Sequence, residues 1–264
     1  MKRSPFATFA LRLWLLPLLL LGLSAPLWLH LWEPAMFVAI NQWCLPLPAS
    51  FWTGLSMLGN AISVLALASP LLLFAPRLMW AMLCALPFVG LMARGGKVWI
   101  TSPRPASEID NTLFRIVGEV LHNDSMPSGH TTTAVALAGA IYFALEPAQR
   151  KRHGWLWILA LGTGLSRIAV GAHWPGDVAV GLCLGLWAGM LANVLLSQVP
   201  ARWCAPEHWA MRCAALLVAA TVYLLITDQI DFDENAPAQK VLAVLASVVL
   251  LVFARRSARS LNAR

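Results

Sequence analysis

The stretch that decides the fold of this chain lies at residues 166–177 and reads SRIAVGAHWPGD. It places a cation (Arg167), an imidazole (His173) and a carboxylate (Asp177) in an otherwise apolar sequence. Ionisable groups are costly in apolar surroundings, so by default they indicate a functional site there. Two further polar segments, at residues 97–105 and 127–130, are predicted to serve the same site, and the rest of the chain to form the scaffold around it.

The composition of the 264 residues indicates a polytopic membrane protein. Hydrophobic residues make up 59% of the chain and charged residues 12%, whereas soluble domains are about 45–50% apolar and about 25% charged. The net charge of +7 would suggest a nucleic-acid partner in a soluble protein. In a membrane protein, the orientation of the chain in the bilayer explains the basic residues better than nucleic-acid binding does, so no nucleic-acid partner is predicted. The five Cys stand singly, which favours neither a disulfide framework nor a zinc site.

Eight apolar stretches are each long enough to cross roughly 30 Å of hydrocarbon. They predict an all-α membrane helix bundle with spans near residues 13–31, 53–75, 78–98, 130–146, 155–173, 177–197, 211–229 and 238–254. The first stretch could be a signal peptide cleaved after Leu-Ser-Ala at residues 23–25. Its apolar run is longer than the usual h-region of about 7–15 residues, and Pro26 would follow the cut, so an uncleaved first helix is expected.

We divide the chain into three parts on this basis. Residues 1–50 form an N-terminal transmembrane helix and outer loop, and residues 51–197 form a membrane core that contains the three polar segments. Residues 198–264 form a C-terminal transmembrane hairpin with a basic cytoplasmic tail.

The distribution of Lys and Arg predicts that both termini are cytoplasmic, because cytoplasmic loops carry an excess of these residues. Thirteen of the 19 then fall on the cytoplasmic side: Lys2, Arg3, Arg12, Arg77, Arg150, Lys151, Arg152, Arg202, Arg212, Arg255, Arg256, Arg259 and Arg264. Six remain on or near the opposite face: Arg94, Lys97, Arg104, Arg115, Arg167 and Lys240. All three polar segments therefore lie on the outer face.

Two further patterns are interpreted as structural. Gly181, Gly185 and Gly189 repeat at four-residue spacing, which lets two membrane helices approach closely. In the outer loop at 107–121, apolar residues recur at helical spacing between charged ones, and Ser107 with Asp110 resembles a capping box. This loop is predicted to form a short amphipathic helix on the membrane surface, either as a connector or as a border of a substrate entrance.

The polar residues together favour phosphoryl transfer without a metal. Lys97, Arg104 and Arg167 supply three cations, and Arg forks with a Lys suit the oxygens of a phosphate. The turn at 127–130 precedes an apolar helix whose N-terminus can bind an anion. The four-residue spacing of His173 and Asp177 lets the carboxylate hold one imidazole nitrogen while the other attacks. A second imidazole, His130, can then act as general acid.

These residues resemble the three signature motifs of the phosphatidic-acid phosphatase type 2 superfamily. The matching patterns are Lys97-x6-Arg104-Pro105, Pro127-Ser128-Gly129-His130 and Ser166-Arg167-x5-His173-x3-Asp177. Members are integral-membrane lipid phosphatases related to bacterial acid phosphatases and vanadium haloperoxidases. The resemblance covers residues 50–197, where the family places a six-helix core; the last two helices, from about 211, lie outside it.

The resemblance implies a role for each matching residue. His173 is the nucleophile that forms a phosphohistidine, Asp177 orients it, and His130 protonates the leaving oxygen and then activates water. The phosphate is bound by Lys97, Arg104 and Arg167, with help from Ser128 and the backbone of Gly129. No metal or other cofactor is implied.

The expected function is that of a lipid phosphatase or diphosphatase in the bacterial inner membrane, with its site facing the periplasm or outside. The expected partners are a phosphorylated lipid substrate and the membrane lipids. Undecaprenyl diphosphate is the first substrate to consider; phosphatidylglycerophosphate, phosphatidic acid, lipid A phosphates and transfer to a second lipid stay open. A protein that binds or transports a lipid phosphate without chemistry, or a vanadium haloperoxidase, would leave the paired His or the apolar chain unexplained.

Overall fold

Four helices at the centre of the molecule position the polar segments. The computed structural model describes residues 9–262, so Lys2, Arg3 and Arg264 of the topology analysis lie outside the described residues. Helix α9 (Gly129–Ala144) packs against α7 (Pro76–Trp99), α11 (Trp155–Ala169) and α12 (Pro175–Leu196). The described residues contain helices and loops but no strand, which confirms the all-α expectation.

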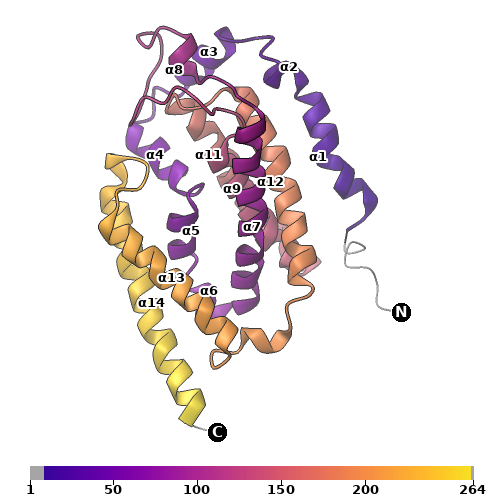
Figure 1. Cartoon of the computed structure of the whole chain (residues 1–264), viewed down its shortest axis with the longest axis vertical. Helices are drawn as coiled ribbons and strands as arrows, with labels where there is room; N and C mark the ends of the chain where they lie inside the picture. The colour runs from indigo at the N-terminus through magenta and orange to yellow at the C-terminus, as the bar shows by residue number, and fades with distance from the viewer. Residues whose placement is uncertain (1–8, 263–264) are drawn as a thin grey trace.

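The remaining helices surround this centre (Figure 1). On one side lie α1 (Leu11–Leu23) and α2 (Ala25–Trp28), which pack on α12; on the other side, α13 (Trp209–Thr227) and α14 (Ala236–Asn262) form a hairpin against α5. The other elements are α3 (Ala35–Trp43), α4 (Ala49–Met57), α5 (Ala61–Leu67), α6 (Leu71–Phe74), α8 (Pro105–Glu108), α10 (Pro147–Arg150) and the short 3-10 turns η2 (Lys151–His153), η3 (Ala201–Cys204) and η4 (Asp233–Asn235).

Small residues set the distance between α9 and α12, as predicted. A Cβ added to Gly185 would lie 2.7 Å from Cβ of Val135 and 2.8 Å from the carbonyl oxygen of Thr132. A Cβ on Gly181 would lie 2.8 Å from the Ser128 carbonyl oxygen. The two helices therefore meet backbone to backbone, and this contact holds the start of α9 against the start of α12.

The prediction of eight unbroken spans is wrong in its details. Among the described residues, four helices are long and apolar enough to cross a membrane (α7, α12, α13 and α14), or five if the bent pair α4 and α5 is counted as one span. The multi-pass membrane character holds. Helices α9 and α11 have 16 and 15 residues, and α1 has 13.

The predicted span at 13–31 is interrupted at Ser24, between α1 and α2. Pro26 explains the break, because proline has no N–H for the helical hydrogen bond and its ring clashes with the preceding turn. Helix α3 follows, and the sequence reading did not anticipate it.

The predicted span at 53–75 is also interrupted, because α4 and α5 meet at an angle of 78°. Asn60 starts the new helix by accepting hydrogen bonds from the backbone N–H groups of Ile62 and Ser63. Gly59 lies directly against His130, where a Cβ would come within 2.6 Å of that residue's Cβ. The bend therefore brings the polar start of α5 to the start of α9.

The amphipathic helix predicted at 107–121 is absent: α8 ends at Glu108 and an irregular loop follows. Hydrogen bonds to other segments replace those of a helix. The backbone N–H of Arg115 donates to the Asn41 side chain, and that of Val117 donates to the carbonyl of Val170. Asp110 accepts from the backbone and hydroxyl of Thr112, which favours a turn.

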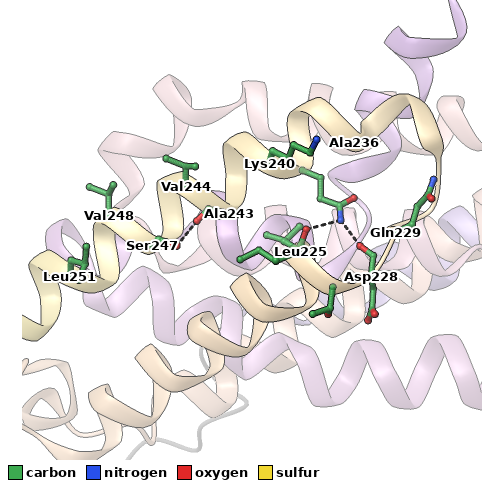
Figure 2. A pocket seen from close by; sticks show the side chains of 13 residues that line it. Leu225, Asp228, Gln229, Ala236, Lys240, Ala243, Val244, Ser247, Val248 and Leu251 are labelled. Atoms are coloured by element: carbon green, nitrogen blue, oxygen red, sulfur yellow. Dashed lines mark hydrogen bonds between the residues drawn. The ribbon is translucent and has the colours of Figure 1, made fainter.

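The C-terminal hairpin is fixed by Gln239, which ties its connecting loop to α14. The Gln239 amide donates to the carbonyls of Leu225 and Asp228, drawn as dashed lines in Figure 2. A cavity of about 590 Å³ lies beside this loop, lined mainly by apolar side chains of α13 and α14. It contains none of the motif residues, so the polar chemistry of the chain lies elsewhere.

The close contact of α9 and α12 leads to a stability prediction. Gly185→Ala should lower the unfolding temperature in detergent, because over-packing of this kind costs about 1–3 kcal/mol. The matched control is Gly90→Ala in α7, because a Cβ at this position would meet nothing within 4 Å. This variant should leave the unfolding temperature unchanged or raise it slightly. Equal unfolding temperatures for the two variants would contradict this packing.

Candidate functional site

His173 and Asp177 form a buried pair at the junction of α11 and α12. Nδ1 of His173 lies 3.3 Å from Oδ2 of Asp177, and the two side chains are 3% and 0% exposed. The same carboxylate oxygen accepts hydrogen bonds from the backbone N–H of Trp174 and the hydroxyl of Ser125. The carboxylate is therefore fixed, and it holds Nδ1 of the imidazole so that Nε2 is left for chemistry.

A sharp turn brings His173 back towards the end of α11. Gly171 has a φ of +79°, a conformation that glycine adopts without steric cost. A Cβ at this position would also lie 2.6 Å from the carbonyl oxygen of Arg115. After the turn, the backbone N–H groups of Ala172 and His173 donate to the carbonyl of Arg167, which sets the cation and the imidazole side by side.

Two buried guanidinium groups face this imidazole. Arg104 is 7% exposed and Arg167 is 4% exposed. Arg104 donates to the carbonyls of Asn123, Asp124 and Ala172. Arg167 donates to the hydroxyl of Ser56 over 2.9 Å, and its Nε has no hydrogen-bond partner among the described residues. The Arg167 guanidinium therefore keeps donor capacity for an anion.

The start of α9 supplies the second imidazole. Ser128 caps the helix, accepting hydrogen bonds from the backbone N–H and the hydroxyl of Thr131. The Ser128 side chain is fully buried. His130, one residue inside the helix, has a side chain that is 21% exposed.

These elements enclose one cavity of about 280 Å³. Six of the eight predicted site residues line it: Lys97, Arg104, Gly129, His130, Arg167 and His173. Asp177 lies behind His173, and Ser128 lies behind the first turn of α9. The cavity thus combines three cations with two imidazoles, an arrangement that can bind a phosphate and attack it.

The loop at 109–123 also contributes to the cavity, although it is not a helix. Ile116, Val117, Glu119 and Leu121 line the wall. Of the two roles left open for this segment, a border of the cavity fits these contacts, whereas the expected helical form is absent.

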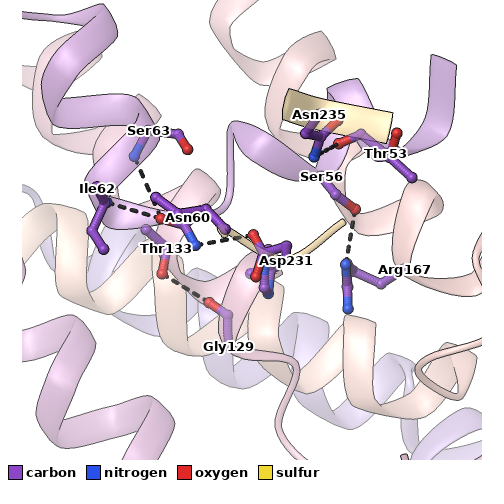
Figure 3. Close-up of polar contacts among 12 residues, drawn as sticks. Thr53, Ser56, Asn60, Ile62, Ser63, Gly129, Thr133, Arg167, Asp231 and Asn235 are labelled. Carbon is purple, nitrogen blue, oxygen red and sulfur yellow. Dashed lines mark hydrogen bonds and ion pairs between the residues drawn. The ribbon is translucent and has the colours of Figure 1, made fainter. Parts of the chain in front are cut away.

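The C-terminal hairpin contributes two residues that the motifs did not indicate. Oδ2 of Asp231 lies 3.1 Å from Nε2 of His130 and accepts a second hydrogen bond, of 2.9 Å, from the amide of Asn60. The ring of Phe232 lies 5.4 Å from the guanidinium carbon of Arg167, a distance at which ring and cation attract. Figure 3 shows Asp231 between Asn60 and Arg167. The available signal was that the acidic connection 228–234 falls on the same face as the motifs.

The charges of the site act on the groups in its loops. Burial raises the pKa of Asp231, but the hydrogen bond from His130 and the charges of His130 and Arg167 outweigh burial and hold that pKa below its ordinary value. Burial, followed by the charges of Arg104, Arg167 and Lys97, holds the pKa of His173 well below its ordinary value. His173 is therefore neutral near pH 7 and has a free lone pair.

Comparison with known proteins agrees with this geometry. Residues 75–203 match the model of the PAP2 superfamily. This region belongs to the PAP2 superfamily. It contains the three motifs from Lys97 to Asp177, whereas Asn60 and Asp231 lie outside it. The crystal structure of Aquifex aeolicus LpxE resembles the chain with a TM-score of 0.53 and 25% identity, covering 60% of this chain and 92% of that one.

Two curated relatives are similar to parts of this chain. The lipid A 1-phosphatase of Rhizobium johnstonii is 33% identical over 127 residues, which are 47% of this chain and 50% of that protein. The undecaprenyl-diphosphatase BcrC of Bacillus subtilis is 43% identical over 90 residues, which are 34% of this chain and 42% of that protein. The chain spans about half the length of the curated relatives it matches, or less.

The electrostatics of the PAP2 site predict the protonation state of His173. Because burial and three neighbouring cations lower its pKa, its ring should stay neutral at pH 6, where an ordinary histidine is largely protonated. The measurement is a ¹⁵N-histidine NMR titration, with the His173 signals assigned by their loss in His173→Ala. A midpoint at or above the ordinary value of about 6.5 would contradict this electrostatic field.

Proposed function

We propose that this chain is a membrane lipid phosphatase that hydrolyses a phosphate from a lipid through a phosphohistidine on His173. The observation that carries the proposal is the cavity itself. It brings Nε2 of a neutral, carboxylate-held imidazole into the same space as Lys97, Arg104 and Arg167. Cations that only bind a headgroup would not need a buried His–Asp pair behind them.

In the first step, the lone pair on Nε2 of His173 attacks phosphorus. The P–O bond to the leaving group breaks, its electron pair goes to the leaving oxygen, and His130 donates a proton to that oxygen. A lipid alcohol or a lipid monophosphate departs. Asp177 stabilises the positive ring of the phosphorylated His173 through Nδ1–H. The three cations and the backbone of Gly129, at the start of α9, stabilise the charge on the phosphoryl oxygens.

In the second step, water attacks the phosphorus of the phosphohistidine. His130, now neutral, takes a proton from this water, and the P–N bond breaks with its electron pair returning to Nε2 of His173. Inorganic phosphate leaves and the site returns to its starting state. A lipid hydroxyl in place of water would give phosphotransfer at the same residues.

The substrate class follows from the site and its relatives together. The cations of the cavity suit a phosphate, and apolar side chains form the wall beside them, which together fit a lipid phosphate. Relatives named as undecaprenyl-diphosphatase and as lipid A 1-phosphatase support two substrates of this class. We place undecaprenyl diphosphate first and lipid A 1-phosphate second.

Loss of the nucleophile should abolish the reaction. Purified protein should release phosphate from at least one of undecaprenyl diphosphate, lipid A, phosphatidylglycerophosphate and phosphatidic acid, and should do so in the presence of EDTA. His173→Ala should lower kcat at least about a thousandfold, because a covalent nucleophile has no substitute. The matched control is His153→Ala, at the other end of α11, which should keep full activity.

Labelled substrate separates this proposal from binding or transport without chemistry. A base-stable, acid-labile phosphoenzyme should form on the natural chain and be absent in His173→Ala. Full activity of His173→Ala would contradict the nucleophile, and headgroup binding without any phosphate release would favour the transport alternative.

We further propose that the site faces the outer side of the bacterial inner membrane. Arg77 lies at the start of α7, Arg150 follows the end of α9 and Arg202 follows the end of α12, whereas the cavity lies at the other ends of these helices. Arg255 and Arg256 lie near the end of α14, far along that helix from the connection that carries Asp231. A surplus of basic residues at that end fits a cytoplasmic location.

This orientation predicts the access of chemical probes. In a background without the five natural Cys, Asp233→Cys in the loop near the cavity should react with a membrane-impermeant maleimide in intact spheroplasts. Lys151→Cys, at the other end, should react only after the membrane is opened. The reverse pattern would place the site on the cytoplasmic face.

A further inference from the structure

The proposed chemistry gives His130 two opposite tasks, yet its own motif supplies nothing that holds its ring. The hydrogen bond that holds the His130 ring comes from a distant part of the sequence. Nε2 of His130 lies 3.1 Å from Oδ2 of Asp231, a residue 101 positions away in the connection of α13 and α14. The two side chains are 21% and 20% exposed, so the contact lies at the edge of the cavity and is only partly shielded from water.

We propose that Asp231 is a positioning residue that forms a second Asp–His pair with His130, so that the C-terminal hairpin is part of the active site. The carboxylate accepts Nε2–H and leaves Nδ1 as the nitrogen that gives and takes the proton. In this arrangement each catalytic imidazole of the cavity has its own carboxylate: Asp177 for His173 and Asp231 for His130. The inference rests on the proposed function, and it assigns a role to a residue outside the 75–203 match.

The position of Asp231 is built by several independent contacts. Its φ is +60°, a backbone conformation in which Asp and Asn are enriched among non-glycine residues. The flanking residues Ile230 and Phe232 are 5% and 6% exposed and anchor the loop. The Asn235 amide donates to the carbonyl of Thr53 in α4. The carboxylate is thus held by the fold and is not a mobile surface group.

Asn60 fixes the other side of the carboxylate. Its side-chain oxygen caps α5, and its amide therefore points away from that helix and donates to Asp231 over 2.9 Å. The bend between α4 and α5 is what places this amide beside His130. Two segments that flank the matched region therefore meet at one catalytic imidazole.

The charge of Asp231 suits a group that must be protonated before the first step. Burial and the charges of Arg167 and Lys97 oppose the positive form of His130, and burial with the same cations keeps His173 neutral. Asp231 is the carboxylate in direct contact with the ring, and an opposite charge at this distance favours the protonated imidazole. Without it, His130 would lose its proton at lower pH.

Asp231→Asn tests this role, because Asn keeps the side-chain shape and tolerates the same positive φ. On the lipid phosphate, kcat should fall about 10- to 100-fold with little change in KM, as for loss of part of general-acid catalysis. The alkaline limb of the kcat profile should move to lower pH by about one unit or more. The matched control is Asp233→Asn, an exposed residue of the same loop, which should leave kcat and the pH profile unchanged.

A double-mutant cycle separates positioning from general support of the fold. In a His130→Ala background, Asp231→Asn should change kcat by less than about twofold, because Asp231 then has no imidazole to act on. Equal losses in both backgrounds, or a kcat and pH profile equal to those of Asp233→Asn, would overturn the proposal.

A second variant covers the case in which Asp231→Asn does not fold. Asn60→Ser keeps a good helix cap for α5 but removes the amide that holds Asp231. Its kcat should fall severalfold, and an unchanged kcat would overturn the proposal. Failure of the proposed function can be distinguished from failure of the Asp231 proposal. A fully active His173→Ala, or no phosphate release from any lipid, would contradict the proposed function itself, independently of the Asp231 variants.

Discussion

The burial of Arg167 is the constraint on which the rest of the structure depends. A guanidinium that is 4% exposed inside an apolar bundle is costly unless other groups compensate it. Its partners come from distant segments: the hydroxyl of Ser56 in α4 and the ring of Phe232 in the C-terminal hairpin. The negative charge of Asp231 acts from the same hairpin. Segments before and after the central helices must therefore dock on the end of α11 for this cation to be stable there.

The same constraint explains why several helices are short or bent. Irregular backbone is tolerated at membrane depth only where it is buried in protein or lines a polar cavity. The ends of α7 and α11, the starts of α9 and α12, and the bend between α4 and α5 all meet around the cavity. The loops between these helices provide carbonyls for the site, such as those of Asn123 and Ala172, which accept hydrogen bonds from Arg104. Their length is set by the cavity and not by the hydrocarbon thickness alone.

The sequence predicted what depends on local spacing and missed what depends on distant contacts. The His173–Asp177 pair and the close contact at Gly185 follow from residues four apart on one helix or turn, so the printed order of residues is sufficient to find them. The bend at Asn60 and the loop at 109–123 are stabilised by hydrogen bonds to other segments, which override apolar periodicity. Asp231 pairs with a residue 101 positions away, so neither motif nor periodicity could connect the two.

The cavity has a charged wall and an apolar wall, and the two differ in how well they can distinguish one lipid from another. In the proposed reaction, the cations and imidazoles bind the phosphoryl group that is transferred, which all these lipids share, so they contribute little to the choice among lipid tails. The remaining wall is formed largely by apolar side chains, namely Ile116, Val117, Leu121 and Phe232. Apolar contacts discriminate by shape, at about 1–3 kcal/mol for one methylene. Under the proposed function, the choice of lipid therefore depends on the loop at 109–123 and on the C-terminal hairpin. Asp231 and Phe232 of the hairpin belong to both kinds of wall. In the proposed reaction, a change in the docking of the hairpin would therefore alter lipid selection and proton transfer together.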